Sequence, residues 1–432
     1  MSKAKEYSGM TKDKLMTYTF VALVVLVAVS FVTFGLDSLL ISVIAVLVAV
    51  GLDFLLSKVA ADSPLDTLSA AVFGLIVALS YSLGSPNIAS ETVDVLGGYS
   101  QYLYPAIISA VGLVLFKKIQ GLRGRKIVNP AAAAKLLVLV FLLVPALLPV
   151  DHTMLSLTST TSLGAPDYFG YNVLACYSNR TDLLTPDFAI NFDFNDVLYS
   201  LAVLKVHGWV GGVSSIAVVA VGVALFILCR RYIKWRITVA YLAATALVAL
   251  GLGFYYGGDP MLRVIFHLFL GSSIFLAFFM ATDPATTPLT HSGQLIFGVG
   301  LAVLTVLIQT YTGFLGGSIL ALLIMNLTSP WLDRVGKLRP IAEKKEPKLP
   351  KGKQFAAVKI TQCIRCGACM RVCCHKLSPI LIKEAFDKSN IEKLMKLEAN
   401  LCDGCGHCTF ICPARIDLRG SILRSKALLR AK

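Results

Sequence analysis

Long apolar runs separated by short polar segments are the dominant pattern of this chain. Ten runs are long enough to cross a bilayer as helices, which takes about 20 residues. They cover residues 15–35, 37–57, 67–85, 101–117, 130–150, 210–229, 236–256, 262–281, 293–311 and 314–331. The first run is too long for a removable signal peptide and has no small-residue cleavage site. The pattern therefore predicts an α-helical polytopic membrane protein with about ten transmembrane helices.

Composition agrees with that pattern and divides the chain into parts. Only 15% of the residues are charged, whereas soluble domains carry roughly a quarter. Four parts follow from the polar segments and the cysteines. They are an N-terminal tail (1–14), a membrane domain (15–332) with one long loop (151–209), a basic linker (333–358) and a C-terminal domain (359–432).

Basic residues mark one side of the membrane. They gather in the N-terminal tail, in the loop after the fourth run and in the loop after the sixth, whereas the loop 86–100 holds only acids. Cytoplasmic loops are the ones enriched in Lys and Arg. We therefore expect both termini on the cytoplasmic side of the cell membrane and the loop 151–209 outside. These loops and the linker account for most of the net charge of +15. The linker can attract anionic lipid or an acidic donor protein, and nothing in the chain is typical of nucleic-acid binding.

Nine of the eleven cysteines lie between residues 363 and 412, and eight of them form two runs of identical spacing. "CIRCGACMRVC" begins at Cys363 and "CDGCGHCTFIC" begins 39 residues later. Clustered thiols in a reducing compartment favour metal over disulfides. The spacing CxxCxxCxxxC is typical of bacterial two-cluster ferredoxins. Zinc is the alternative, but it needs only four cysteines.

In the two-cluster pattern the fourth cysteine of each run ligates the other cluster. The spacing therefore predicts a small α+β ferredoxin-type domain with two [4Fe–4S] clusters. The ligands of the first are Cys363, Cys366, Cys369 and Cys412, and those of the second are Cys402, Cys405, Cys408 and Cys373. Cys374 stands where the pattern usually has proline, as a neighbour that could compete for iron. His375 and His407 are expected to be exposed and unligated.

Ten runs divide into five plus five, which predicts two inverted five-helix repeats with a binding region between them. Asn129-Pro130 and Asp283-Pro284 break the helices at corresponding places. They either cap helices or form a flavin or ion site, so a second flavin is an open alternative. "GWVGGVSS" at 208–215 contributes Gly211, Gly212 and Ser214 either to a cofactor site or to close helix packing.

Particular stretches carry a family resemblance. "RKIVNPAAAA" (125–134), "FLAFFMATDPATTPLTHSGQLIFGVG" (275–300) and "LIMNLTSPWLD" (323–333) resemble the D subunit of Rnf complexes. The B subunit of the sodium-pumping NADH:quinone oxidoreductase is a relative with the same motifs. Residues 360–430 are similar to the ferredoxin segment of the Rnf C subunit.

The resemblance implies a covalent flavin. Rnf proteins of the D type carry FMN on a Thr of an outer loop, in a motif similar to Ser-Gly-Ala-Thr. The matching loop here reads "DHTMLSLTSTTSLGAPD" (151–167). The best alignment makes Thr161 the flavinylated residue, with Thr160 as the alternative. A loop without covalent flavin also remains open, because Ser159 and Thr160 replace the small Gly-Ala pair.

The resemblance also implies a function. We expect a redox subunit of an Rnf-like ion-translocating oxidoreductase, which passes electrons between cytoplasmic iron–sulfur donors and flavin. About 30 Å of hydrocarbon separates the two sides. This gap predicts partner subunits. The resemblance implies small helical subunits with an intramembrane iron–sulfur centre and an outer flavoprotein, and a cytoplasmic ferredoxin or iron–sulfur subunit is expected to exchange electrons with the clusters. The chain has no Gly-rich dinucleotide fingerprint, so no NAD site is expected on it. The alternatives are an uncoupled electron conduit, and a solute transporter with an iron–sulfur sensor.

Overall fold

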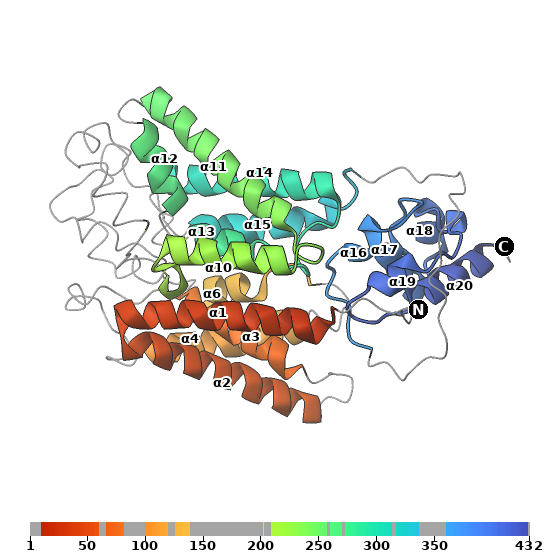
Figure 1. Ribbon diagram of the computed structural model, residues 1–432, viewed down its shortest axis with the longest axis horizontal. Helices are drawn as coiled ribbons and strands as arrows, with labels where there is room; N and C mark the ends of the chain where they lie inside the picture. The colour runs from red at the N-terminus through yellow and green to blue at the C-terminus, as the bar shows by residue number, and fades with distance from the viewer. Residues whose placement is uncertain are drawn as a thin grey trace, which may run out of the picture.

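The computed structural model describes residues 10–59, 66–81, 100–119, 126–138, 202, 209–256, 260–269, 273–312, 317–336 and 360–430. Within these residues the regular elements are helices (Figure 1). Five helices are long and apolar enough to cross a membrane, or six if one helix pair bent by 57° counts as a single span. The prediction of a helical multi-span membrane protein is thus confirmed. The count of ten spans stays a prediction beyond these.

The membrane helices form two consecutive groups. The first consists of α1 (Lys12–Phe34), α2 (Leu36–Val59), α3 (Thr67–Leu79), α4 (Ser100–Val111) with its π-helical continuation η1 (Gly112–Ile119), and α6 (Pro130–Val138). The second consists of α10 (Ser215–Leu228), α11 (Trp235–Tyr256), α12 (Pro260–Phe269), α13 (Ser273–Phe275) with η7 (Leu276–Met280), α14 (His291–Thr312) and α15 (Gly317–Leu332). Each of the ten predicted runs contains one of these helices or helix pairs. The inverted relation between the halves stays a prediction.

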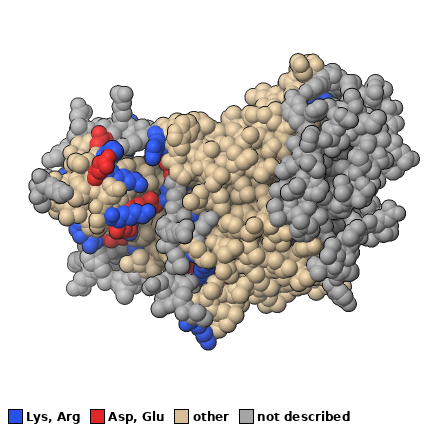
Figure 2. Space-filling model, turned by 180° about the vertical axis from the view of Figure 1, so that it is seen from behind, with Lys and Arg blue, Asp and Glu red and all other residues tan. Residues whose placement is uncertain are grey.

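The surface of the helices suits a lipid solvent. In Figure 2 the described surface over the helices is almost free of charged side chains, which gather instead on the C-terminal domain. Large apolar side chains point outward, among them Val32, Leu247 and Phe254, whose exposed fractions are 82%, 69% and 72%. Apolar side chains can stay exposed without cost in hydrocarbon, whereas charged ones cannot.

Close helix contacts depend on small residues, since lipid gives little hydrophobic drive for helices to associate. At Gly74 of α3 a Cβ atom would lie only 2.8 Å from the carbonyl oxygen of Ala45 and from the Cα of Val46. The backbones of α2 and α3 therefore touch. Ser109 of α4 donates a hydrogen bond of 2.8 Å to the same Ala45 carbonyl.

We expect Gly74→Leu to separate α2 from α3 and to lower the free energy of unfolding by about 1–3 kcal/mol, because an overpacked core must shift. The measurement is the melting temperature of the detergent-solubilised protein, followed by size-exclusion chromatography after heating. Gly51→Leu is the matched control on α2, because a Cβ atom at Gly51 would meet nothing within 4 Å. Equal melting of the two variants would contradict this view of the contact.

The C-terminal domain is built from short helices. They are α16 (Ala368–Arg371), α17 (Pro379–Asp387), α18 (Ile391–Lys396), the 3-10 turn η8 (Ala399–Leu401), α19 (His407–Ile411) and α20 (Leu418–Arg430). No strand occurs between residues 360 and 430, so the α+β character predicted for this domain is wrong there. The stretch between the cysteine runs forms α17 and α18. Pro379 begins α17, where proline suits the first helical turn, and Ile380, Ile382 and Ala385 are buried along it.

The two cysteine runs fold as one backbone pattern used twice. Left-handed residues recur at the 39-residue period: Arg365 and Gly404, Gly367 and Gly406, Lys376 and Arg415. The N–H of Cys373 donates to Met370 and that of Cys412 to Thr409, again at matching places. α17 and α20 follow the two runs and pack against each other. The sequence duplication is therefore a structural one.

Candidate metal centre and its contact with the membrane helices

Each cysteine run bends so that backbone amides face the thiols. The N–H of Arg365 lies 3.3 Å from the Sγ of Cys363, and the N–H of Gly404 lies 3.4 Å from the Sγ of Cys402. The left-handed backbone at Arg365 and Gly404 makes this turn possible. Amide donors directed at sulfur stabilise thiolate ligands and are one of the factors that set the reduction potential of an iron–sulfur cluster.

The fold brings the eight thiols into two groups that cross between the runs. Cys412 lies close enough to Cys363, Cys366 and Cys369 of the first run for their charges to interact, and Cys369 also interacts with Cys408 of the second run. Cys373 is in turn a neighbour of the second run. Its group consists of Cys402, Cys405 and Cys408. This exchange of the fourth cysteine is what two cubane clusters require, and the residues therefore fit that cofactor.

The buried thiols of the second group need a bound cation in order to ionise. Burial raises the pKa of the Cys408 thiol to about 12, and the neighbouring thiols Cys402, Cys405 and Cys373 contribute to this rise. Burial likewise raises the pKa of Cys405 to about 11. Thiols with such pKa values are protonated at neutral pH unless a cation displaces the protons. Iron ions would supply that positive charge.

Cys374, Asp403 and His375 lie beside the second group. The Sγ of Cys374 is 3.6 Å from the Sγ of Cys405, and the ligand atoms of Cys374, Asp403 and Cys405 all lie within 4.8 Å of one another. His375 is buried, with its Nε2 3.2 Å from a carboxylate oxygen of Asp403. The expectation of an exposed His375 is therefore wrong, because Asp403 follows Cys402 into the same turn and draws the imidazole inward. His407 is half-buried.

The loop 281–290, between η7 and α14, is held by hydrogen bonds to side chains in and beside neighbouring helices. The ammonium group of Lys234, which is 1% exposed, donates hydrogen bonds of 2.8 Å to the carbonyls of Pro284 and Thr287. Ser329 donates to the carbonyl of Thr286 at 2.7 Å. Asp333 accepts a hydrogen bond of 2.7 Å from the backbone N–H of Leu289. This loop is part of the stretch 275–300 that carries the family resemblance, and it forms a platform at the surface of the membrane domain.

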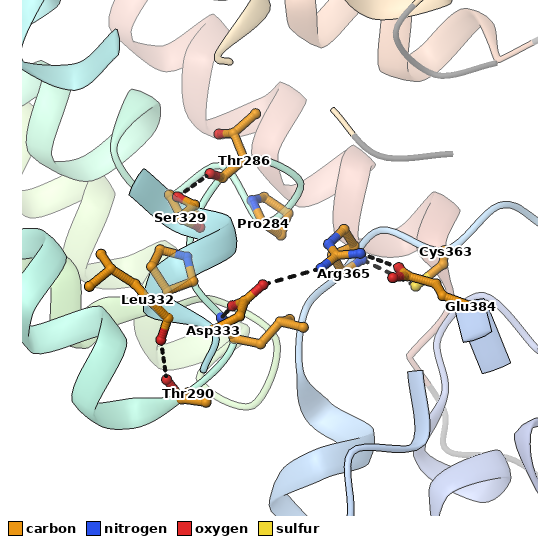
Figure 3. A network of polar contacts seen from close by, with 12 residues as sticks. Pro284, Thr286, Thr290, Ser329, Leu332, Asp333, Cys363, Arg365 and Glu384 are labelled. Carbon is orange, nitrogen blue, oxygen red and sulfur yellow. Dashed lines mark hydrogen bonds and ion pairs between the residues drawn. The ribbon is translucent and has the colours of Figure 1, made fainter. Parts of the chain in front are cut away.

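The first cysteine run lies directly on this platform. The guanidinium group of Arg365 pairs with Asp333 at 3.6 Å and with Glu384 of its own domain (Figure 3). A Cβ atom on Gly367 would be 3.8 Å from Leu289, in ordinary van der Waals contact. Lys234 is an electrostatic neighbour of Cys366.

A second contact joins the start of α1 to the C-terminal domain. The N–H of Lys12 donates a hydrogen bond of 3.0 Å to the carbonyl of Pro413, the residue after Cys412. The beginning of α1 and the C-terminal domain therefore lie at the same end of the helical bundle, as Figure 1 also shows.

Asn129 and Asp283, predicted from the helix breaks, line the same cavity of about 150 Å³. Asn129 accepts hydrogen bonds from the N–H groups of Ala131 and Ala132 and donates one to the carbonyl of Met280. It thus caps α6 and ties the two helix groups together. Asp283 accepts hydrogen bonds from residues of its own loop. Asn129 therefore caps a helix, whereas Asp283 stabilises a turn of its own loop. The aromatic rings of Phe73, Phe278, Phe279 and Tyr232 also line the cavity.

The described part of the glycine-rich segment 208–215 makes close packing contacts instead of bordering an open site. Gly211, in the 3-10 turn η5 (Val210–Gly212), is surrounded closely enough that a Cβ atom would lie 2.7 Å from side chains of Leu79 and Phe275. Gly212 is buried in the same turn, and Ser214 caps α10 by accepting from the N–H of Ala217. Thr160 and Thr161 lie outside the described residues.

Four residues of the contact were not found by pattern analysis. They are Lys234, Asp333, Arg365 and Glu384. A signal existed for one of them, because Arg365 stands where the second run has Gly404. A bulky residue at a left-handed position is unusual enough to suggest a role for its side chain.

Comparisons with known proteins match the chain up to the linker. The sequence profile of the NQR2, RnfD, RnfE family matches residues 2–342. The chain is 28% identical over 275 residues to the D subunit of the Na(+)-translocating ferredoxin:NAD(+) oxidoreductase complex of Acetobacterium woodii, covering 63% of this chain and 72% of the relative. It is 28% identical over 303 residues to the D subunit of an ion-translocating oxidoreductase complex of Shewanella sediminis, covering 65% and 80%. The D subunit of the proton-translocating ferredoxin:NAD(+) oxidoreductase complex of Clostridium ljungdahlii is 30% identical over 236 residues, covering 53% and 65%.

Proposed function

The chain belongs to the NQR2, RnfD, RnfE family, and on that premise we propose that it is a D-type redox subunit with its own two-cluster iron–sulfur domain. It would serve an Rnf-like complex that couples electron transfer to movement of Na⁺ or H⁺. The observation that carries the proposal is the contact of the first cysteine run, which lies beyond the family match, with the platform 281–290 inside the match. Such a contact would give electrons a short route between the iron–sulfur domain and the membrane domain.

We assign one [4Fe–4S] cluster to Cys363, Cys366, Cys369 and Cys412, and the other to Cys402, Cys405, Cys408 and Cys373. The crossed grouping of the eight thiols supports this assignment over zinc, which needs only four. When bound, the clusters supply one-electron transfer at low potential. The protein's part is to hold the thiols, direct backbone amides at them and fix their position against the membrane domain.

We assign the covalent FMN to Thr161, with Thr160 as the alternative, on the motif match to Rnf proteins of the D type. Asn129 and Asp283 line a cavity of about 150 Å³ beside the loop 281–290, which is smaller than the ~300–1,000 Å³ typical of cofactor sites, so we give a second flavin there less weight. Gly211 and Ser214 are better explained by packing and capping, so we give the flavin role of this segment less weight.

The proposal places the protein in the cell membrane with the C-terminal domain in the cytoplasm. The contact between Lys12 and Pro413 supports termini on one side. Flavin on the outer side would be separated from the clusters by about 30 Å of hydrocarbon. We therefore expect partner subunits: small membrane subunits with an intermediate iron–sulfur centre, an outer flavoprotein, and a ferredoxin or iron–sulfur subunit in the cytoplasm. NAD would bind elsewhere in the complex.

The test is purification of the complex from its native membranes, followed by reconstitution into sealed vesicles. We expect iron, acid-labile sulfide and flavin to copurify with several subunits, and reduced ferredoxin to generate an ion gradient that an ionophore abolishes. An uncoupled conduit would transfer electrons with no gradient. A transporter with a sensor domain would lack flavin and bind a solute. A zinc-containing single chain would overturn the proposal.

A further inference from the structure

Arg365 differs from its counterpart in the second run in a way that points to a role at the membrane domain. Both residues occupy the left-handed region, with φ of 53° at Arg365 and 77° at Gly404. Glycine adopts this conformation without penalty, whereas a residue with a side chain is strained there. The fold therefore accepts strain at Arg365 that the second run avoids.

Glu384, the partner of Arg365 within the C-terminal domain, also has an uncharged counterpart in the second run. Glu384 lies 39 residues before Leu423, so the second run has the pair Gly404 and Leu423 where the first has Arg365 and Glu384. In the second run the leucine fills the space, because a Cβ atom on Gly404 would be 3.4 Å from Leu423. The ion pair is thus not needed to form the turn.

The side chain of Arg365 reaches out of its own domain. It is 4% exposed and lies between Glu384 and Asp333, the latter at the end of α15 (Figure 3). One carboxylate oxygen of Asp333 holds the N–H of Leu289, and the other faces the guanidinium group. Arg365 therefore binds to the same carboxylate that holds the platform in place.

The second run makes no such contact with the loop 281–290 among the described residues, although Pro413 at its end accepts a hydrogen bond from the N–H of Lys12 in α1. The atoms nearest to a Cβ on Gly404 belong to Leu423 and Arg419, which are in the C-terminal domain. A small cavity beside Cys402, Cys405 and Cys408 is likewise lined only by residues of that domain. The two runs are therefore unequal in their relation to the loop 281–290.

We propose that the ion pair between Arg365 and Asp333 docks the first cysteine run on the loop 281–290. The cluster held by Cys363, Cys366, Cys369 and Cys412 then exchanges electrons with the membrane domain. The second cluster is directed toward a soluble iron–sulfur partner. The electron route rests on the proposed function, whereas the docking itself does not. Arg365 acts here as a positioning residue.

Docking is tested by hydrogen exchange of the full-length protein in detergent. R365G/E384L installs in the first run the pair found in the second, so the C-terminal domain keeps a turn that it already uses. D333N keeps the acceptor for Leu289 and removes the charge. We expect amide exchange in 284–290 to rise about tenfold or more in both variants, because an interface held by a buried ion pair opens when one partner is lost. Lys396→Gln, in an exposed pair with Glu392, is the control and should match the wild type. If the amides of 284–290 exchange as slowly in R365G/E384L and D333N as in the wild type, the proposed docking is wrong.

The electron route is tested by the rate at which reduced ferredoxin bleaches the flavin of the purified complex. In R365G/E384L the iron content and the paramagnetic resonance of both clusters should stay at the wild-type level. Flavin reduction should slow by about tenfold or more, because the observed rate follows the fraction of docked molecules. R365K, which keeps the charge, should restore part of the rate. A wild-type rate in R365G/E384L would overturn the route. Wild-type protein without iron would instead refute the proposed function, and the exchange experiment would still decide the docking.

Discussion

Replacing Cys412 by serine is expected to remove the cluster of the first run while leaving the cluster of its own run in place. The reason is the crossed grouping, in which Cys412 lies with Cys363, Cys366 and Cys369. Loss of one ligand in four should abolish that cluster. Iron content should therefore fall from about eight to about four atoms per chain. The measurement is iron and sulfide analysis with low-temperature paramagnetic resonance of the reduced protein.

Two further variants make the experiment decisive. Cys373→Ser should remove the other cluster, so that the two spectra differ and together account for the wild type. Cys374→Ser should retain both clusters, since Cys374 is a neighbour of Cys405 rather than a ligand in this assignment. Loss of the second-run signal in Cys412→Ser would show that each run holds its own cluster and would contradict the crossed grouping.

Replacing Thr161 by alanine is expected to abolish covalent flavin completely. An alanine has no hydroxyl group through which a phosphodiester could form, so the effect should be all or none. The measurement is flavin fluorescence of the chain under ultraviolet light after denaturing electrophoresis, which removes any flavin that is held without a covalent bond.

Thr160→Ala is the matched control, because it changes the adjacent residue in the same Thr-Ser-Thr-Thr stretch. Its fluorescence should remain. The reverse result would move the bond to Thr160, and a wild-type chain without fluorescence would defeat covalent flavinylation. The wild type and the two variants should contain the same amount of iron, because Thr160 and Thr161 lie outside the C-terminal domain that holds the cysteines.

Much of the fold follows from local patterns. The apolar runs predicted helices at positions where helices are found, because a segment in lipid must satisfy its backbone hydrogen bonds within itself. The repeated cysteine spacing similarly implied a repeated turn. The α+β prediction failed between residues 360 and 430, since a cysteine spacing specifies the loops but not the structure of the residues between them. That stretch forms α17 and α18 instead.

The site was predictable only in part. Asn129 and Asp283 were identified from the prolines that follow them, and the fold brings both to one cavity. Whether they cap helices or bind a ligand could not be read from the prolines, because either role uses the same residue types. His375 was expected on the surface, since nothing in the chain order places the carboxylate of Asp403 beside it.

By itself, the sequence determined that the chain is helical and apolar over most of its length and that eight thiols occur in two identical runs. These properties depend on neighbours a few residues apart, so composition and spacing carry them. Only the tertiary structure decided that Arg365 meets Asp333 and that the first run, not the second, lies against the loop 281–290. Such contacts join residues from separate helices and domains, and their free energy depends on burial and on the distance between charges in space.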